Sequence, residues 1–385
     1  MMHSKINIIG CGLSGMITAL SLAKRGINST IIEKNNVNDP SFFNDVRTTA
    51  ITSSSKYFFQ SIGIWTEIEQ YVGAINEIYV ADNKSELMIH FSSHMLENEE
   101  IMGYIVENKD FKKCLLELAR ANSYIKIIDN SSYELVENND HECVIVVNES
   151  IKLNSDLLIV CDGSNSVIRQ KYFTPKFEKT YKQNALTFIV GHENNHEGTA
   201  VEHFMPLGPF AILPLKDQHL SSVVWTIDSA MNNAILNLSE EEFLYLVQEN
   251  FGKFLGNIAI KSKIASFPLK AYVTDKYYNN KIVLVADCAH IIHPLAGQGL
   301  NQGIKDIEAL ISNIFKFGIN DISLENYQNE RERDNAAMFE ITDTLNAIFS
   351  NNSKILHLAR QLGFSAIENI SPLKKLFIKY AMGKR

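Results

Sequence analysis

Two glycine-containing segments have the residue types and spacing that suit the binding of an anionic ligand. The first is Gly10-Cys11-Gly12-Leu13-Ser14-Gly15, which directly follows a short apolar run. The second spans residues 282–306, begins with another apolar run and continues through Asp287, Gly297 and Gly299 to Asp306. Where a buried strand turns into a helix through glycines, the first N–H groups of the helix and the positive end of its dipole point at the ligand. Both segments therefore predict binding sites for phosphate or a similar group.

The first segment has the pattern of a dinucleotide-binding βαβ unit. A strand at residues 6–9 precedes it, a helix follows to Gly26, and a second strand at residues 30–32 ends in Glu33. In such a unit the first glycine allows the tight turn, the second lets a pyrophosphate approach, and the third allows close packing of helix on strand. An acid about 20 residues further on accepts a hydrogen bond from a ribose hydroxyl. The residues expected to hold the nucleotide are Gly10, Gly12, Leu13, Ser14, Gly15, Glu33 and Lys34. A purely structural turn is the alternative.

The second segment suits a flavin. A reduced flavin is anionic at one ring edge and carries a ribityl chain, for which the carboxylate of Asp287 is an acceptor. The expected contacts are Asp287, Pro294, Gly297, Gln298, Gly299, Leu300 and Asn301. Two alternatives remain, namely an ordinary strand-to-helix turn and a metal site built from His290, His293, Asp287 and Cys288. No other clustered Cys/His pair completes a metal site, so we predict none.

Residues 287–301 resemble the second FAD-binding motif of the aromatic-ring flavoprotein monooxygenases, usually Gly-Asp-Ala-Ala-His, a Pro, then Gly-x-Gly-x-Asn. The sequence of residues 293–301 resembles the ubiquinone-biosynthesis hydroxylase branch of this family more than the family in general. Residues 162–169 resemble the Asp-Gly motif of the family, which implies that Asp162 serves FAD and a transiently bound nicotinamide nucleotide. Residues 47–52 resemble the segment whose arginine, here Arg47, reaches the flavin nucleotide; a solvated loop arginine is the alternative.

The chain departs from the family pattern at two positions. Ala286 stands where a glycine is usual, which adds one methyl group near the cofactor. Lys112 lies near the place of a glutamine that often touches the cofactor, so this chain has a different side chain there.

Composition limits the function classes. The 385 residues carry a formal net charge of −8, which argues against nucleic acid as a partner. The five cysteines show no Cys-x-x-Cys spacing, which indicates free thiols in a reducing compartment. We see no room for a signal peptide before the first strand and no apolar run long enough to span a bilayer, and therefore expect a cytoplasmic protein.

The tail, residues 371–385, predicts a basic amphipathic helix. One face carries Leu373, Leu376, Phe377, Tyr380 and Ala381, and the rest of the surface carries Lys374, Lys375 and Lys379. This pattern suits peripheral contact with the inner face of an anionic membrane or with a partner in a biosynthetic assembly. A terminal helix that packs on its own FAD domain is an equally weighted alternative.

The resemblance implies an α/β fold with a Rossmann-like FAD-binding domain similar to that of p-hydroxybenzoate hydroxylase, a β-sheet-rich substrate domain and C-terminal helices. We expect the FAD-binding domain at residues 1–72, 100–171 and 273–345, the substrate domain at 73–99 and 172–272, and a C-terminal helical region at 346–385. His203 and Trp225 suit either a substrate pocket or the core. The mixed charges at residues 330–334, within a helix expected over 324–348, predict a solvated face.

The resemblance also implies the activity, FAD-dependent hydroxylation of the aromatic ring of a polyprenylated phenol in ubiquinone biosynthesis. Enzymes of this kind reduce the flavin with NAD(P)H or a ferredoxin-type reductant, form a C4a-hydroperoxide with molecular oxygen and pass one oxygen atom to the ring. A phenol supplies its own activation, so no catalytic protein residue is assigned. The alternatives are a monooxygenase acting on a soluble phenol and a non-catalytic flavin-binding subunit of an assembly. A halogenase is disfavoured, because residues 225–228 lack the second Trp and the Pro of that motif.

Overall fold

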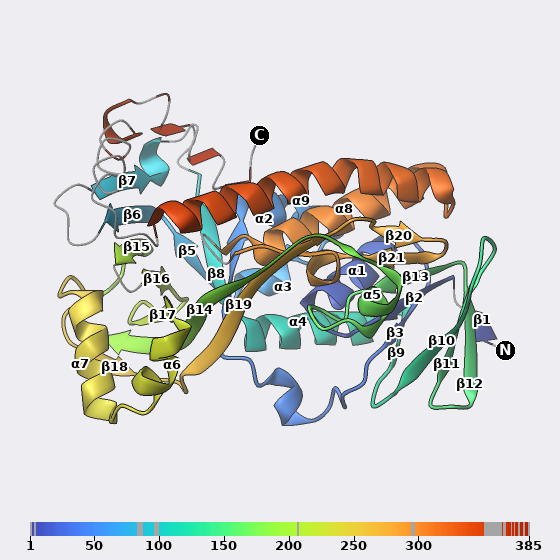
Figure 1. The fold of residues 1–385 in the computed structure, drawn as a ribbon, viewed down its shortest axis with the longest axis horizontal. Helices are drawn as coiled ribbons and strands as arrows, with labels where there is room; N and C mark the ends of the chain where they lie inside the picture. Colours follow the sequence, from blue (N-terminus) through green and yellow to red (C-terminus); the bar gives the residue numbers. More distant parts are fainter. Residues whose placement is uncertain are drawn as a thin grey trace.

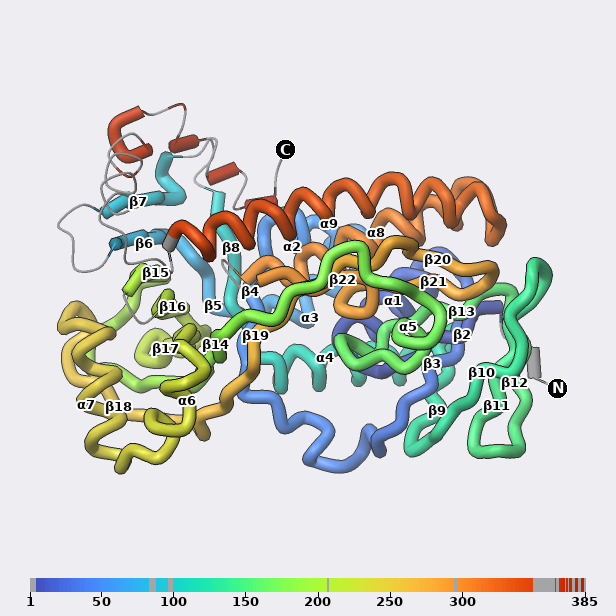
Figure 2. Tube along the Cα trace, in the orientation of Figure 1, coloured from blue at the N-terminus to red at the C-terminus, as the bar shows by residue number. Residues whose placement is uncertain are grey.

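The computed structural model describes residues 2–3, 5–82, 88–95, 100–205, 208–293 and 297–349, and in the C-terminal part residues 364, 367–370, 372, 374, 375, 378, 379, 382 and 383. Within this described part the strands form four sheets, and an α/β fold is confirmed. A four-stranded sheet within residues 2–155 and the strands β6 (Glu77–Asp82) and β7 (Met88–Ser92) lie at opposite ends of the long axis (Figure 2). No helix among the described residues is long and apolar enough to cross a membrane.

A six-stranded sheet carries both glycine segments. Its order is β20 (Tyr278–Asn279), β21 (Ile282–Leu284), β13 (Leu157–Val160), β2 (Ile6–Ile9), β3 (Ser29–Ile32) and β9 (Ile125–Ile128). The strands β21, β13, β2, β3 and β9 run parallel, and the residues of β2, β13 and β21 are all buried. Uninterrupted apolar runs suit such strands because helices cover both faces of a parallel sheet.

Helices from distant parts of the sequence pack around this sheet (Figure 1). They are α1 (Leu13–Lys24), α4 (Asn108–Ala121), α5 (Val167–Tyr172), α8 (Gly299–Phe317) and the long α9 (Asp321–Phe349). A three-stranded sheet of β4 (Thr48–Thr52), β8 (Gly103–Glu107) and β5 (Val72–Ile75) lies beside them with α2 (Ser53–Ile62) and α3 (Trp65–Glu69), and η1 covers Pro40–Phe43. A smaller sheet joins β1 (Met2–His3), β12 (Ile151–Ser155), β11 (Cys143–Val147) and β10 (Tyr133–Asn138).

The second large unit is a nine-stranded sheet. Its path is β22 (His290–Ile291), β19 (Ala265–Thr274), β14 (Pro175–His192), β17 (Leu220–Asp228), β16 (Gly208–Pro214), β15 (Thr199–Met205), β6 (Glu77–Asp82) and β7 (Met88–Ser92), with β18 (Ile258–Ile260) beside β14. The helices α6 (Ser229–Leu236) and α7 (Glu240–Phe251) cover one face, and the predicted capping box of Ser239 and Glu242 opens α7. The domain boundaries given above stay predictions.

One face of the nine-stranded sheet contacts the long helix α9 and the strand β4. Tyr181 of β14 donates a hydrogen bond to Asp343 of α9 at 2.9 Å, and Lys179 pairs with the same carboxylate at 2.5 Å. Thr48 of β4 and Ser222 of β17 share a hydrogen bond of 2.8 Å between their hydroxyls. The nine-stranded sheet therefore contacts both α9 and the β4 region, which adjoins the second glycine segment.

The prediction of a solvated face at residues 330–334 is wrong for Arg331. Its side chain is buried and bonded to Asp306. The other residues of this run are exposed or half-buried, as expected for a solvated face. A run of mixed charges does not reveal which of its members faces α8. The helix itself begins and ends close to the predicted residues.

Part of the tail predicted as a basic amphipathic helix lies among the described residues. Leu373, Leu376, Phe377, Tyr380 and Ala381 lie outside the described residues. Lys374 was expected on the surface, but it is buried and pairs with Glu368 at 2.8 Å. Ile378 and Met382 are buried against residues of β5, β8 and β14, and the backbone of Met382 accepts a hydrogen bond from Ser54 at 3.3 Å. The described tail residues thus pack on the chain itself.

Candidate functional site

The first glycine loop closes on the neighbouring strand and leaves its second glycine open. Gly10 has φ +97°, and a Cβ atom there would lie 2.7 Å from the carbonyl oxygen of Cys161. A Cβ on Gly15 would lie 2.0 Å from the carbonyl oxygen of Gly10. By contrast, a Cβ on Gly12 would meet nothing within 4 Å. Gly10 and Gly15 thus serve close packing, and the space beside Gly12 is free for a ligand.

Gly12 is also the N-cap residue of α1, and no side chain caps this helix. The first intrahelical bond of this turn runs from the N–H of Met16 to the carbonyl oxygen of Gly12. The backbone N–H groups of Leu13, Ser14 and Gly15 precede it and point out of the helix end. Three N–H groups and the positive dipole end are therefore directed at the open space.

Glu33 lies next to this loop at the end of β3. It is buried, and one carboxylate oxygen accepts the N–H of Cys11 at 2.8 Å. The other oxygen accepts the backbone and side-chain N–H groups of Asn35 at 2.9 Å and 2.8 Å. Lone pairs remain for one more donor, such as a ribose hydroxyl. Lys34 is exposed beside it.

The second junction is strained at Ala286. This residue has φ +58°, a left-handed backbone conformation that L side chains rarely adopt. Its N–H donates to Asp306 at 3.0 Å, and its methyl group fills the place where a Cβ of Gly303 would be. Asp287 follows within η4 (Ala286–Cys288), with an exposed side chain. The surrounding protein nevertheless raises the pKa of Asp287 by desolvation, an effect that His290 and Arg47 oppose.

The α8 N-terminus has the same open geometry as α1. Gln298 is the N-cap residue without a side-chain hydrogen bond to the helix, and a Cβ on Gly299 would meet nothing within 4 Å. Gly297 has φ +62° and approaches Ala50 closely, while Pro294 lies outside the described residues. The N–H groups of Gly299, Leu300 and Asn301 precede the first intrahelical bond, which Gln302 makes.

The side chain of Asn301 makes hydrogen bonds to other parts of the chain. Its amide oxygen accepts from the backbone of Thr52 at 3.0 Å and from the hydroxyl of Ser55 at 2.8 Å. Its amide nitrogen donates to the carbonyl oxygens of Ala50 at 2.8 Å and Gly297 at 3.2 Å. The side chain therefore holds β4 and α2 to the start of α8, and the backbone N–H is left for a ligand.

Arg47 lies between Asp45 and the second junction. Its guanidinium pairs with Asp45 at 2.6 Å and lies 5.3 Å from the ring centre of Phe267 on β19. Hydrogen bonding to Asp45 raises the pKa of Arg47, and the charge of Asp287 acts in the same direction. Lys112, the departure noted above, donates to the carbonyl oxygen of Phe42 at 2.7 Å.

Asp162 belongs to the same cluster through contacts that the sequence does not reveal. It accepts hydrogen bonds from Tyr133 at 3.1 Å and from the thiol of Cys288 at 3.2 Å. Arg169 donates to the hydroxyl of Tyr272 at 2.5 Å, and that hydroxyl donates to the backbone carbonyl of Asp287. The Asp-Gly motif is thus bonded directly to the second glycine segment.

A buried network around Asp306 supports the junction. Asp306 accepts from His290 at 2.6 Å, Arg331 at 2.8 Å and Asn335 at 3.1 Å. Burial alone would raise the pKa of Asp306, but His290 and Arg331 outweigh it and hold this pKa well below its usual range. The sequence offered His290 only as an alternative metal ligand and Arg331 as part of a solvated face, and it did not predict this network. The only signal was the position of Asp306 at the end of the second glycine segment.

The proposed metal ligands are engaged in other contacts. His290 bonds to Asp306, whereas the Nε2 atom of His293 lies 3.3 Å from Gln183, and burial lowers the pKa of His293 to about 4. Among the described residues no group of His, Cys, Asp and Glu has an arrangement that could hold a metal ion. Trp225 is fully buried against Phe210 in the core below α7, on the side of the sheet away from β4.

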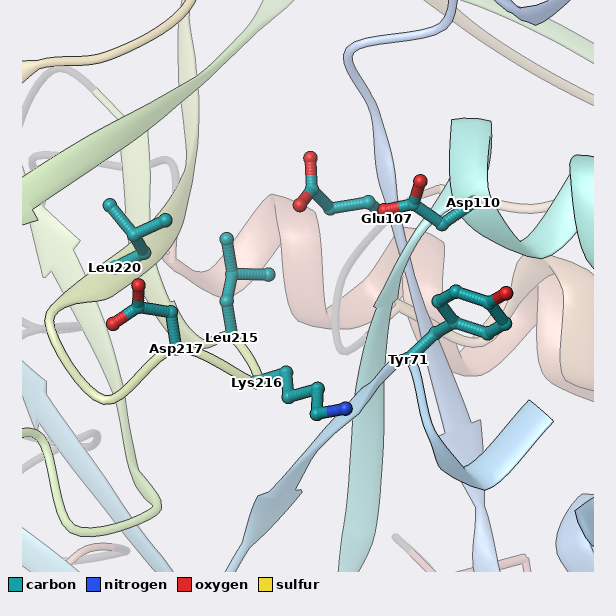
Figure 3. Close-up of a pocket in the computed structure, with 7 residues that line it drawn as sticks. All are labelled: Tyr71, Glu107, Asp110, Leu215, Lys216, Asp217 and Leu220. Atoms are coloured by element: carbon teal, nitrogen blue, oxygen red, sulfur yellow. The ribbon is translucent and has the colours of Figure 1, made fainter. Parts of the chain in front are cut away.

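A separate pocket of about 370 Å³ lies where the β16–β17 loop meets the β8–α4 corner (Figure 3). Its lining is Tyr71, Glu107, Asp110, Leu215, Lys216, Asp217 and Leu220. None of the predicted ligand-binding residues is among them. We therefore place the candidate site at the two helix N-termini and not at this pocket.

The residues present fit a flavin dinucleotide. Two uncapped helix N-termini, each with an open glycine, suit the pyrophosphate and the anionic ring edge. Glu33 and Asp287 supply carboxylate acceptors for ribose and ribityl hydroxyls. A family model described as FAD binding domain matches residues 3–342. The chain belongs to this family of FAD-dependent monooxygenases.

Relatives of this family align along nearly the whole chain. Ubiquinone hydroxylase UbiL of Rhodospirillum rubrum is 31% identical over 98% of this chain and 89% of its own length. The 3-demethoxyubiquinol 3-hydroxylase of Escherichia coli is 29% identical over 99% of this chain and 98% of its own. The solved structure of p-nitrophenol 4-monooxygenase PnpA from Pseudomonas putida superposes with a TM-score of 0.83 over 100% of both chains at 16% identity. The predicted fold and family are confirmed.

Proposed function

We propose that this chain hydroxylates the aromatic ring of a polyprenylated phenol in ubiquinone biosynthesis, with FAD as cofactor and molecular oxygen as oxidant. The observation that carries this proposal is the chain-long similarity to the ubiquinone hydroxylases of Rhodospirillum rubrum and Escherichia coli. The open N-termini of α1 and α8 support it, because they offer binding groups for both halves of the cofactor.

FAD, when bound, supplies the redox and oxygen-activating chemistry. We propose that the N–H groups of residues 13–15 bind the pyrophosphate and that Glu33 accepts a ribose hydroxyl. Asp287 orients the ribityl chain, and the N–H groups of residues 299–301 stabilise negative charge on the ring. Arg47, Asp162, Lys34 and Gln298 complete the proposed contact set. The nine-stranded sheet excludes water from the ring through its contacts with β4 and α9.

The electron donor is part of the proposal. We assign it to NAD(P)H or a ferredoxin-type reductant. The support is the Asp162–Arg169 segment, which bonds to the flavin junction through Tyr272 and Cys288. Anaerobic flavin reduction by each reductant, with and without a prenylphenol, distinguishes the two donors.

We further propose a cytoplasmic location with peripheral contact at the inner face of a membrane or with a biosynthetic assembly. Lys375 and Lys379 are exposed and support this contact, although Lys374, Ile378 and Met382 face the chain. Liposome flotation tests the proposal with the double charge reversal Lys375→Glu/Lys379→Glu, which leaves the buried tail residues in place. Equal flotation of variant and parent argues against membrane contact through these lysines.

The activity is tested by incubation with a prenylphenol, a competent reductant and oxygen-18 gas. We expect product that carries one heavy oxygen atom. An unchanged substrate, with flavin reduction demonstrated in the same sample, would favour the non-catalytic subunit. Turnover of a soluble phenol in preference to the prenylated one would favour the other alternative.

A further inference from the structure

Glu202 is a carboxylate in the interior of the nine-stranded sheet. It lies on β15, which pairs with β16 on one side and with β6 on the other, so it is not at a sheet edge. Its neighbours Val201 and His203 face α7: Val201 packs with the core below α7, and His203 lies 3.3 Å from the carbonyl oxygen of Asn250. Because side chains alternate along a strand, Glu202 points to the opposite face.

That opposite face is turned toward the candidate site. Glu202 pairs with Ala211, which pairs with Val224, which in turn pairs with Thr187. These residues form one row across four strands. The neighbouring rows on the same face include Ser222, bonded to Thr48 of β4, and Phe267, which lies beneath the Arg47 guanidinium. The row that contains Glu202 thus lies between two contacts with the flavin-binding part.

The surroundings of Glu202 are apolar. Its partners across the strands are Ala211 and Val80, and no ion pair or hydrogen bond to another described residue involves its carboxylate. Asp82 is the charged residue on the same face of β6, opposite Phe204 in the next row. Burial raises the pKa of Glu202 to about 8, and no charge of another described residue contributes. In the same row the hydroxyl of Thr187 is buried and has no hydrogen-bond partner among the described residues.

Glu202 is half-buried, and an unpaired carboxylate with reduced access to water costs stability unless a ligand provides the missing partner. A phenol hydroxyl is such a partner, because it donates one hydrogen bond and loses its proton near pH 10, as tyrosine does. A base is more effective when its pKa lies close to that of the group it deprotonates. Ordinary glutamate is too weak a base for a phenol, whereas a desolvated one is better matched.

We propose that Glu202 accepts a hydrogen bond from the hydroxyl of the phenolic substrate and takes its proton when oxygen is transferred to the ring. The phenol O–H bond breaks, the proton moves to a Glu202 carboxylate oxygen, and the electron pair left on oxygen activates the ring carbon that receives oxygen. One atom of molecular oxygen enters the ring and the other leaves as water, with two electrons from the donor named above. When aromaticity returns, the ring proton is released to solvent and the proton on Glu202 returns to the original phenol oxygen, so the product is a neutral diphenol and Glu202 is again a carboxylate. This inference rests on the proposed function.

The decisive variant is Glu202→Gln, which keeps the shape but cannot take a proton. We expect kcat/KM for a prenylphenol to fall by about 10²-fold or more, in the range of general-base contributions. In the parent, kcat/KM should rise with pH through about 8, the pKa of Glu202. In Glu202→Gln this rise should move toward the phenol's own value, about 10. Glu202→Asp should retain part of the rate. The matched control is Glu178→Gln, an exposed carboxylate on β14 of the same sheet, which should behave as the parent.

A second measurement is independent of turnover. Infrared difference spectra of the oxidised, FAD-loaded protein should contain a carboxylic-acid C=O band that titrates in the parent and is missing in Glu202→Gln. Addition of a prenylphenol without reductant should shift this band. A parent that shifts the band but never hydroxylates would support Glu202 as the phenol contact and contradict the proposed function. Hydroxylation by Glu202→Gln with the parent's rate and pH profile would overturn the inference and leave the function intact.

Discussion

The two glycine junctions both turn a strand into a helix with an open N-terminus, but different contacts stabilise them. Around α1, the left-handed position of the tight turn is occupied by a glycine, Gly10, and the packing contacts come from within residues 10–33 and the adjacent strand β13. Around α8, the left-handed position is occupied by Ala286, and the N–H of this residue is held by Asp306, which lies 20 residues away in the sequence. The first junction is stable through local geometry, and the second depends on a buried charge network. Substitutions in each should therefore have different consequences.

Gly12→Val should have the largest effect on cofactor binding. A Cβ atom on Gly12 would meet no described protein atom within 4 Å, so we expect the fold to tolerate the branched side chain, which fills the space in front of the α1 N-terminus. We expect a folded protein almost free of flavin, measured by flavin absorbance per chain and circular dichroism. A variant that is as yellow as the parent would show that this loop is structural only.

Asp306→Asn should have the largest effect on stability. It removes the fully buried carboxylate that pairs with the guanidinium of Arg331 and leaves the partly exposed Asp334 at 2.7 Å as its charged partner, so the loss should lie toward the lower end of the about 3–5 kcal/mol of unfolding free energy that breaking a buried pair costs. Chemical denaturation of the flavin-free protein measures this loss. The double variant Asp306→Asn/Arg331→Met should recover part of it, and equal loss in both would argue against the ion pair as the cause.

The same network predicts a pH dependence. The pKa of Asp306 is lowered in the folded state, so its contribution to the unfolding free energy is present above the unfolded value of about 4 and is lost as pH falls toward the folded value.

Glu202 has the opposite effect on how the unfolding free energy depends on pH. Its pKa is raised to about 8, so stability falls as pH rises from about 4.5 to 8, and Glu202→Gln should remove that fall. Thermal melting of the parent and Asp306→Asn below about pH 4, and of the parent and Glu202→Gln between about pH 4.5 and 8, separates the two contributions.

Asp287→Ala should weaken FAD binding while leaving the α1 loop intact. Loss of a charged hydrogen bond to a ribityl hydroxyl corresponds to about 1.5–3 kcal/mol, or roughly 10- to 100-fold in dissociation constant. Titration of the flavin-free protein with FAD measures it. An unchanged affinity would remove Asp287 from the proposed contact set.

Ala286→Gly is the smallest predicted change and the most specific to this comparison. Glycine relieves the left-handed backbone at φ +58° and should raise the unfolding free energy by about 0.5–1 kcal/mol. The matched control is Ala289→Gly, a buried alanine with φ −88° in the right-handed region, where glycine should lower stability. If both variants lose stability equally, Ala286 is not strained.

What the sequence determined by itself is local. The first strand, the glycine loop, the first helix and Glu33 lie within residues 6–33, and both the hydrogen bond from Cys11 to Glu33 and the packing of Gly15 on Gly10 form within this range. The second glycine segment was recognisable for the same reason, because a strand, glycines and a helical repeat are contiguous.

Only the tertiary structure decided which charges are buried and with what. Arg331 sits in a run of mixed charges, and its burial depends on α9 crossing α8 at Asp306. Lys374 is buried where it pairs with Glu368, whose carboxylate also accepts the backbone N–H of His90 on β7. Tyr272 of β19 joins Arg169 of α5 to Asp287 of η4. The sequence does not distinguish Glu202 from other polar strand residues, whereas pairing with β16 and β6 places it on the inner face with no ionic or hydrogen-bond partner in the described part of the chain. A periodic pattern specifies that a residue lies on one face of its helix or strand, but the charge, distance and dielectric on that face come from elements far away in the sequence.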